Sequence, residues 1–447
     1  MREFTKEAKT QKRINIFYVA VMVIACANAF LFNSIGYTGS RLVVLLLLGI
    51  SVLTDIEKNF CLIAFCLPMS SILKISSTSI SILPLLYFIV IIKLFLKRKA
   101  RLNIYSLVAL AFFCLLQVSS VLFYGAEVTS IVSLLLNVVF VVCSSAYFFE
   151  YGKENRQLKT TSIFLMSGTF LDIFLCDIFP NIPYIINYQK QSQLDYNNRY
   201  AAMNMDPNEY SQIVLVSIGL AVAIMPLIKS KLGKILDIAV IAYFAVKGYR
   251  SYSKSYVLSL MLLFFVALVI YIFKTAKEKG PIVTMLKFVP IAIVGVIGAS
   301  ILYQYVVVPV FEARSALQAD LLTGRDYIWG EYFKALKQRP DVVVIGCGAS
   351  NSTFLHKYCS LHGSVAHNLY LEFLIQFGIT GIITLSIAWR DSIKSIVKNK
   401  LTNYMVLPLA AFLITSFGIS ENANDCLYVL MFIMSMPYSA NALKKYR

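Results

Sequence analysis

Charge is scarce in this chain. Asp, Glu, Lys and Arg together make up 14% of its 447 residues, whereas hydrophobic residues make up 58%. A soluble globular protein carries roughly 25% charged residues, so this composition excludes an ordinary soluble protein. Apolar runs of bilayer-spanning length recur along the whole chain, and no polar segment between them is long enough for a soluble domain. The predicted fold class is therefore all-α, a polytopic transmembrane helical bundle.

Acidic residues are the scarcer charged type, with 23 Asp and Glu against 41 Lys and Arg, and the net charge is +18. An excess of this size can indicate a nucleic-acid partner. Most of the basic residues, however, lie in short loops between apolar runs, where positive charge determines membrane topology. We therefore expect membrane lipid as a partner and no nucleic acid.

Histidine is rarer still, since the chain has three, at His356, His362 and His367. The spacing H-x-x-C-x-x-H around Cys359 could hold a metal, but no carboxylate or second cysteine completes a ligand set nearby. We expect no metal and no cofactor. A disulfide between Cys347 and Cys359 is the stronger interpretation, because both lie in one loop outside the membrane. The chain has no C-x-x-C motif, which argues against thiol redox chemistry.

The apolar runs predict about fourteen spans with both termini cytoplasmic. The stretch Val23–Cys26 is similar to a lipoprotein processing site, but the apolar run continues to Phe32, which favours a first span over a signal peptide. With the N-terminus inside, every strongly basic connection falls on the same side. The spans are 14–32, 42–54, 59–73, 80–96, 103–123, 129–149, 160–179, 209–228, 234–248, 254–273, 286–308, 366–389, 404–419 and 425–442.

This topology forms a single transmembrane domain over residues 1–447 with two substantial outer loops. The first, residues 180–205, is dense in Tyr, Asn and Gln, which suits sugar rings and is equally typical of an interfacial aromatic belt. The second, residues 311–365, lies between spans 11 and 12. It contains an amphipathic helix that lies on the membrane or closes over the bundle. The apolar face of that helix comprises Ile328, Trp329, Tyr332, Phe333 and Leu336.

A polar stripe enters the span that follows the second loop. On a helix, Asn368, Glu372 and Gln376 share one face, and the stripe from His367 to Gln376 descends roughly 13 Å. A glutamate at that depth cannot face lipid. The stripe is either a polar packing seam between helices or the wall of a site that opens outward.

Two further outer segments carry polar motifs. Asp206 reads as the N-cap of a helix, followed by Pro207 at its first position. The short turn 248–255 places Arg250 and Lys254 on the outer side, against the positive-inside rule. Such cations either hold an anionic ligand or extend toward lipid phosphate.

Cations, a histidine and a glutamate at an outward site suggest glycosyl transfer from a lipid-linked donor. The departing diphosphate gains negative charge, which Arg and Lys can stabilise. The attacking sugar hydroxyl loses a proton, which His or Glu can accept.

Three stretches now indicate a family. They are T-G-R-D-Y-I-W at Thr323–Trp329, P-D-V-V-V-I-G-C-G at Pro340–Gly348, and H-N-L-Y-L-E-F-L-I-Q-F-G-I-T-G at His367–Gly381. D-P-N at Asp206–Asn208 and S-K-S at Ser253–Ser255 are two weaker marks. With these motifs the chain resembles the O-antigen polymerase and O-antigen ligase superfamily of bacterial inner membranes. The resemblance covers the C-terminal half well and the first half only as hydrophobic spans.

The resemblance implies metal-independent, inverting transfer on the outer face of the cytoplasmic membrane. We expect a Wzy-type polymerase that joins undecaprenyl-diphosphate-linked oligosaccharide units, with a chain-length regulator and a flippase as candidate partners. The alternatives are an O-antigen ligase, a lipid-linked oligosaccharide flippase and a scaffold. At S-K-S the family usually has Arg where this chain has Lys254. The expected catalytic residues are His367, Arg325 and Glu372, and the expected substrate-binding residues are Arg199, Arg250, Lys254, Asn368 and Arg314.

Overall fold

The computed structural model describes residues 2–76, 81–97, 102–151, 154–179, 200–204, 206–309, 324–361, 365–398, 406–419 and 423–435. Within these ranges the regular structure is helical, apart from an isolated bridge between Lys74 and Ser81. The prediction of an all-α protein is thus confirmed for the described part of the chain.

Seven of the described helices are long and apolar enough to cross a membrane. These candidate spans lie in α1 (Arg2–Ile35), α5 (Ile104–Tyr124), α6 (Val128–Tyr151), α7 (Glu154–Ile178), α9 (Pro207–Ile224), α11 (Lys254–Lys279) and α16 (Leu369–Ala388).

The other predicted spans overlap further described helices. Each of the fourteen predicted spans overlaps a described helix, but the full count and the topology stay predictions. The other helices include α2 (Tyr37–Leu53), α3 (Ile56–Cys66) with η1 (Leu67–Met69), α4 (Ile82–Leu96), η2 (Met225–Leu227) and α10 (Lys231–Tyr249). They continue with α12 (Pro281–Leu302), η3 (Tyr303–Val307), α17 (Arg390–Lys398), α18 (Val406–Thr415) and α19 (Ala423–Ser435).

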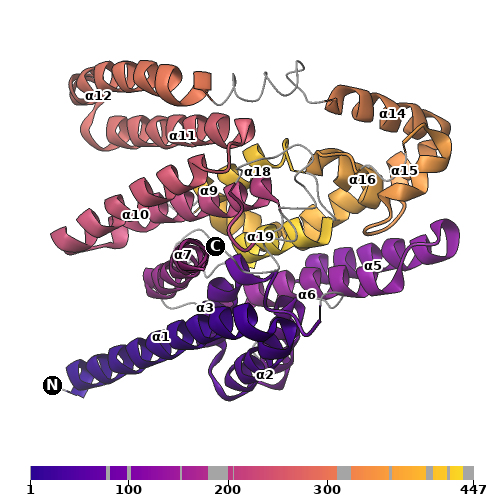
Figure 1. Ribbon diagram of the computed structural model, residues 1–447, viewed down its shortest axis with the longest axis horizontal. Helices are drawn as coiled ribbons and strands as arrows, with labels where there is room; N and C mark the ends of the chain where they lie inside the picture. Colours follow the sequence, from indigo (N-terminus) through magenta and orange to yellow (C-terminus); the bar gives the residue numbers. More distant parts are fainter. Residues whose placement is uncertain are drawn as a thin grey trace.

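Many of the long helices lie side by side, and α14 (Arg325–Gln338) and α15 (Pro340–Ile345) lie at one end of them (Figure 1). We call this the α14 end and the opposite one the α17 end. Tertiary contacts bring the last residues of α5, α7, α10 and α18 and the first residues of α9, α11 and α16 to the α14 end. Helices that follow one another directly, such as α9, α10 and α11, therefore alternate in direction, as short connections in a membrane bundle require.

Residues 324–361 form a small unit, here called the cap, made of α14, α15 and η4 (Ser352–Tyr358). Its side chains build a second hydrophobic cluster with Tyr124 of α5 and Leu371 of α16. Tyr332 is fully buried there, and Ile328 and Trp329 pack against the cluster. Phe333 departs from the predicted apolar face, because its side chain is 55% exposed. The helix α14 therefore packs against the end of α5 and the first turns of α16.

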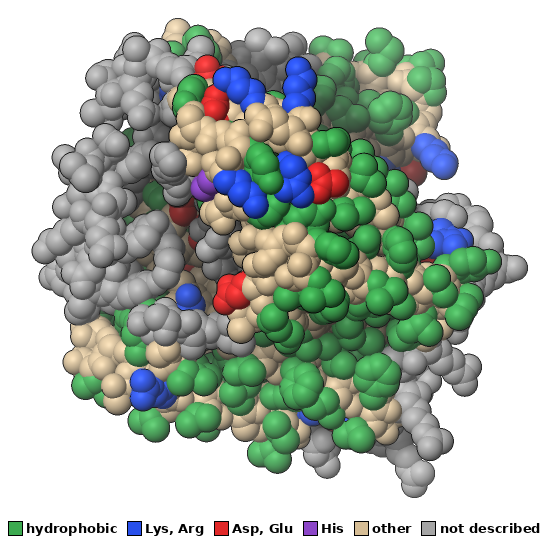
Figure 2. All heavy atoms as spheres, turned by 90° about the vertical axis from the view of Figure 1, so that its right-hand side faces the viewer, with side chains coloured by type: hydrophobic (Ala, Val, Ile, Leu, Met, Phe, Trp, Pro, Cys, Tyr) green, Lys and Arg blue, Asp and Glu red, His purple; other side chains and the backbone are tan. Residues whose placement is uncertain are grey.

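Arg339 holds the cap together. Its Nε and Nη2 donate to the two carboxylate oxygens of Asp341 at 3.0 and 2.6 Å, and its Nη1 donates to the Tyr358 hydroxyl at 2.6 Å. The guanidinium also lowers the pKa of Asp341 to about 2. Tyr124 donates a 2.9 Å hydrogen bond to Asp341 from the end of α5, which fastens the cap to the bundle. Figure 2 looks onto this end, where basic and acidic side chains gather in the upper part, around α14 and α15.

Candidate functional site

The H-N pair stands at the start of α16. Asn368 is the N-cap of this helix, and its Oδ1 accepts hydrogen bonds from the backbone N–H of Tyr370 and Leu371 at 3.0 and 3.2 Å. His367 precedes the helix and has a φ of +51°, a left-handed conformation that costs energy for a residue with a Cβ. The predicted stripe therefore begins with a cap and not inside the helix, and His367 lies in the loop beside it.

Glu372 and Gln376 do lie on one face of α16, and both are buried. Glu372 accepts from the backbone N–H of Ala366 at 2.8 Å through Oε1 and from the side-chain amide of Gln376 at 2.9 Å through Oε2. The Oε1 of Gln376 accepts from the backbone N–H of Ser350 in the cap at 2.9 Å. The stripe is thus a polar seam between α16 and two loops, the first of the two interpretations. Glu372 fixes the residue directly before His367.

The glycine turn of the cap reaches into the bundle. Gly378 interrupts α16 with φ 61° and ψ 175°, and the carbonyls of Ile375 and Gln376 before the break accept from the N–H of Cys347 and Gly348 at 2.8 and 3.0 Å. A Cβ on Gly378 would lie 2.5 Å from the backbone nitrogen of Gly346, so only glycines permit this approach. Non-helical backbone at this depth is tolerated because the protein itself satisfies its polar groups.

Arg325 is the first residue of α14 and points toward the end of α18. Its Nη2 lies 3.3 Å from the carbonyl oxygen of Gly418. A Cβ on Gly418 would lie 2.9 Å from the Ser255 Cβ and 3.6 Å from the Arg325 Nη1. Gly418 is therefore in close contact with the S-K-S motif on one side and with Arg325 on the other. The N–H of Leu369, the first residue of α16, donates to the carbonyl of Ser416 at 2.9 Å.

The two weaker sequence marks are bonded to each other. Asp206 caps α9 by accepting from the N–H of Asn208, as predicted, with Pro207 at the first helical position. Ser253 donates to the Oδ1 of Asn208 at 2.9 Å, and its hydroxyl lies 2.7 Å from that of Ser255. Through Ser255 and Gly418, D-P-N and S-K-S come into one cluster with Arg325.

Electrostatics connects His367 to the same cluster. The pKa of His367 is lowered to about 4, first by burial and then by the positive charge of Arg325, while the carboxylate of Asp206 acts in the opposite sense. Both charges therefore act on the imidazole, which is neutral at pH 7. We call His367, Arg325, Asp206, Asn208, Ser253, Ser255 and Gly418 the candidate site.

Backbone strain marks the same end of the molecule. Among the described residues, four that are not glycine have a positive φ: Ala202 at 49°, Tyr252 at 46°, Ser350 at 55° and His367 at 51°. Ala202 precedes D-P-N, Tyr252 precedes S-K-S, and His367 opens H-N. Conformations of this kind cost roughly 1–3 kcal/mol each and concentrate at functional sites, where surrounding structure holds them.

The other predicted cations are placed differently. Arg250 forms an ion pair with Asp177 at 3.2 Å, and its guanidinium carbon lies 4.7 Å from the ring centre of Tyr200. Within the described ranges these are its side-chain partners, so the structure brings Arg250 to the α14 end without joining it to Arg325. Lys254 is half-buried at the start of α11, between two serines of the candidate site. Arg199 and Arg314 lie outside the described residues.

The predicted disulfide is wrong. Cys347 and Cys359 are both free. Each thiol donates to a backbone carbonyl four residues away: Cys347 to Asn351 at 3.2 Å and Cys359 to Leu355 at 3.4 Å. Cys347 belongs to the turn inserted against α16, which separates it from the cap surface. His362, the third member of the H-x-x-C-x-x-H spacing, lies outside the described residues.

Comparison with known proteins agrees with the motifs. Residues 238–386 match the family model described as O-Antigen ligase, which confirms the resemblance to the O-antigen polymerase and ligase superfamily. No curated protein sequence matches the chain. Over these residues the chain is thus similar to the O-antigen ligase family, and the seven long apolar helices among its described residues indicate a membrane protein.

Several residues of the cluster were missing from the predicted site. In the S-K-S motif the sequence predicted Lys254 as a binding residue, whereas the hydrogen bonds within the cluster are made by Ser253 and Ser255. Asp206 was predicted as a helix cap alone, and its charge also acts on His367. Gly418 could not be recognised from the sequence alone, because it belongs to the site only through its contacts with Ser255 and Arg325, which are distant along the chain.

Proposed function

We propose that this protein is a Wzy-type polymerase, which joins undecaprenyl-diphosphate-linked oligosaccharide units into a surface polysaccharide. The observation that carries the proposal is the convergence of Arg325, His367 and the D-P-N and S-K-S motifs at one end of a membrane bundle, under the cap. Glycan transfer of this kind needs a cation for the leaving diphosphate and a base for the attacking hydroxyl.

In this proposal the α14 end faces the outside of the cytoplasmic membrane. The donor's polyprenyl chain stays in the bilayer, and its diphosphate reaches the end of the bundle. Arg325 stabilises the charge that develops on the departing diphosphate, and a guanidinium can bind two phosphate oxygens at once. Arg250, Lys254, Arg199 and Arg314 are the further candidates for holding that diphosphate.

The neutral imidazole of His367 takes the proton of the acceptor hydroxyl as the new glycosidic bond forms at the anomeric carbon. A base must be unprotonated to act, and the low pKa of about 4 satisfies that condition at pH 7. Asn368 and Glu372 position His367 from either side of it. Asn368 caps α16, and Glu372 accepts a hydrogen bond from the backbone N–H of Ala366. The displacement is inverting and needs no metal in this proposal.

The family description itself favours a second candidate, an O-antigen ligase that moves finished glycan to a lipid acceptor. Gel profiling of surface polysaccharide in a deletion strain, complemented with wild type or Arg325→Ala, separates the two. A polymerase leaves a single repeat unit on the acceptor when it is lost, and the variant fails to restore the ladder. Full-length chains accumulating on undecaprenyl diphosphate would indicate the ligase instead. Repeat units trapped on the inner face would contradict both and indicate a flippase.

A further inference from the structure

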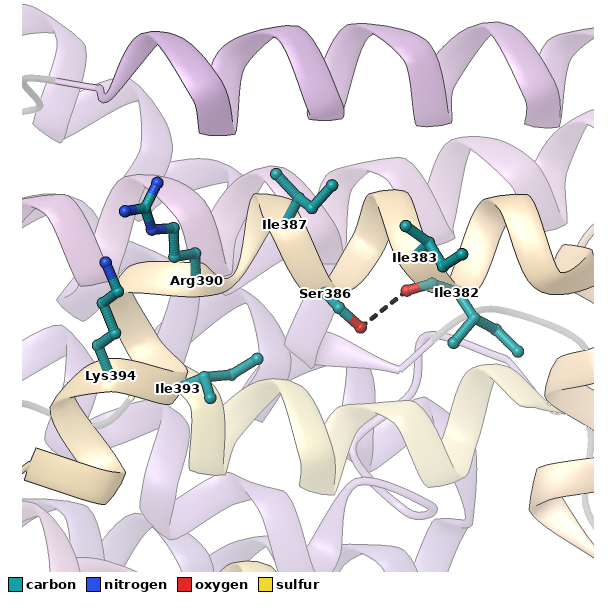
Figure 3. Close-up of a pocket in the computed structure, with 7 residues that line it drawn as sticks. All are labelled: Ile382, Ile383, Ser386, Ile387, Arg390, Ile393 and Lys394. Carbon is teal, nitrogen blue, oxygen red and sulfur yellow. Dashed lines mark hydrogen bonds between the residues drawn. The ribbon is translucent and has the colours of Figure 1, made fainter.

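A pocket lies at the α17 end, away from the candidate site. Its volume is about 430 Å³, within the roughly 300–1,000 Å³ of ligand-binding pockets. It forms where the second half of α16 meets α17 (Figure 3). The lining residues are Ile382, Ile383, Ser386, Ile387, Arg390, Ile393 and Lys394.

The walls of this pocket are apolar. Ile383, Ile387 and Ile393 remain 54%, 42% and 38% exposed, so the protein's own packing leaves them uncovered. The one polar wall residue, Ser386, donates to the carbonyl of Ile382 in its own helix at 2.8 Å. The hydrogen-bonding need of its hydroxyl is therefore met within the helix, and the apolar walls suit a hydrocarbon chain.

The charge of the pocket lies at one end of it. The charged tips of Arg390 and Lys394 lie near each other, while Ile382 and Ile383 lie toward the other end (Figure 3). Within the described part of the chain, neither cation has an acidic partner at salt-bridge distance. The Arg390 guanidinium carbon lies 5.6 Å from the ring centre of Tyr105, at the first turn of α5. An aromatic residue and cations at the end of a span are typical of the bilayer interface.

We infer that this pocket binds an anionic phospholipid of the surrounding bilayer. Its phosphate lies between Arg390 and Lys394, and one acyl chain lies along the isoleucines. Two cations without an acidic partner among the described residues, with an apolar groove running from them, match the two halves of such a lipid, a phosphate and a hydrocarbon tail. The sequence of α17, R-D-S-I-K-S-I-V-K, supports this placement, because its basic and apolar residues separate into two faces of an interfacial helix. The inference does not depend on the proposed function.

The test is native mass spectrometry of the purified full chain in detergent, titrated with dioleoyl phosphatidylglycerol or dioleoyl phosphatidylcholine. The two lipids share their acyl chains and differ in net charge. Wild type is expected to bind phosphatidylglycerol several-fold more tightly. Equal affinity for the two lipids would overturn the inference, and so would retention of a polyprenyl phosphate in place of a glycerophospholipid.

Variants locate the binding. Arg390→Gln with Lys394→Gln is expected to weaken phosphatidylglycerol binding roughly 25-fold, at about fivefold for each basic residue near the headgroup. Lys277→Gln with Lys279→Gln, at the end of α11, removes the same charge outside the pocket and is the matched control. Equal losses in the two double variants would contradict a specific site.

A third variant tests the apolar half. Ile383→Trp fills the groove at an exposed position and leaves both cations in place. It is expected to weaken phosphatidylglycerol binding while the Tm stays within a few degrees of wild type. Unchanged binding by this variant would show that the headgroup alone is held at the surface, and the groove would then be excluded.

Discussion

The indole Nε1 of Trp329 donates a 2.7 Å hydrogen bond to the carbonyl of Ala366. On the other side of the same residue, Glu372 accepts from the Ala366 N–H at 2.8 Å. Ala366 is fully buried, so both of its backbone groups depend on these partners. The helix that begins with Arg325 thereby holds the residue before His367, and the two proposed catalytic groups are positioned by one shared contact.

Trp329→Phe tests this relationship. The ring remains apolar, but the buried carbonyl of Ala366 loses its donor, at a cost of about 1–2 kcal/mol. We expect polymerisation to fall roughly 5- to 30-fold, with the loss in kcat and little change in KM, because the substrate contacts remain. Phe333→Ala, on the exposed side of the same helix, is the control and should retain activity. A Trp329→Phe variant with wild-type kcat would contradict the positioning role.

His367→Ala removes the proposed base. A positioned general base contributes roughly 10²- to 10⁴-fold, so the polysaccharide ladder should collapse to the single unit. His356→Ala removes a different imidazole, one whose Nε2 lies 3.3 Å from the Tyr332 hydroxyl in the cap, and should leave chains of measurable length. Normal chain length in the His367→Ala strain would indicate another base.

The pH profile follows from the same residue. With a pKa of about 4, His367 stays neutral down to about pH 5, so the rate should be constant from pH 8 to pH 5 and fall below that. Between the unfolded-state pKa of about 6.5 and the folded-state value, the unfolded chain binds more protons. Acidification through this window therefore destabilises the fold. A rate that halves near pH 6.5 in proteoliposomes would contradict a neutral, buried His367.

Arg325→Ala should lower transfer by about 100-fold or more, the loss seen when an oriented stabilising group is removed. Arg325→Lys should recover part of this, since Lys restores the charge without the two-pronged grip. Lys337→Ala, an exposed cation later in α14, is the matched control and should be active. Equal activity of the Arg325→Ala and Lys337→Ala strains would exclude Arg325 from the reaction.

Glu372→Gln separates a positioning role from a catalytic one. The amide oxygen of Gln can still accept from the Ala366 N–H, so we expect most activity to remain. Glu372→Ala leaves that buried N–H without an acceptor and should lose about as much as Trp329→Phe. If Glu372→Gln instead removed activity as completely as His367→Ala, the carboxylate itself would be required.

Gly418→Ala tests the close packing within the candidate site. The added methyl would lie 2.9 Å from the Ser255 Cβ, closer than packed atoms allow, so the start of α11 and the chain at Gly418, whose carbonyl accepts from Arg325, must move apart. We expect a large loss of polymer with the protein still in the membrane at normal level. Gly49→Ala in α2 is the control, because nothing lies within 4 Å of the added atom. Equal activity of the two glycine variants would show that the packing tolerates the shift.

The helices in the apolar runs were predictable, because a helix is one of the few structures that satisfy every backbone polar group inside a bilayer. Apolar runs of sufficient length recur in the sequence, and each of them overlaps a helix. The start of α9 was equally predictable from the sequence, because Asp206 is its N-cap and Pro207 its first residue, as these residue types favour. The amphipathic helix at Arg325–Gln338 was found from its periodicity and from the proline that follows it. The H-N-L-Y-L-E stretch indicated the family, and residues 238–386 match it.

Other features depended on contacts between distant segments. The distinction between a polar seam and an open wall rests on where Ser350 and Ala366 lie relative to Gln376 and Glu372. No pattern along α16 contains that information. The disulfide expectation failed for the same reason, because the turn that carries Cys347 is drawn into the bundle by the break at Gly378.

The sequence by itself determined that the chain is a helical membrane protein and which family it resembles, since hydropathy and short motifs act locally. Only the tertiary structure decided that Asn208, Ser253, Gly418, Arg325 and His367 share one end of the bundle. Burial is the physical reason. Groups that are far apart along the chain depress a pKa or exclude a methyl group only after packing has brought them together and removed the water between them.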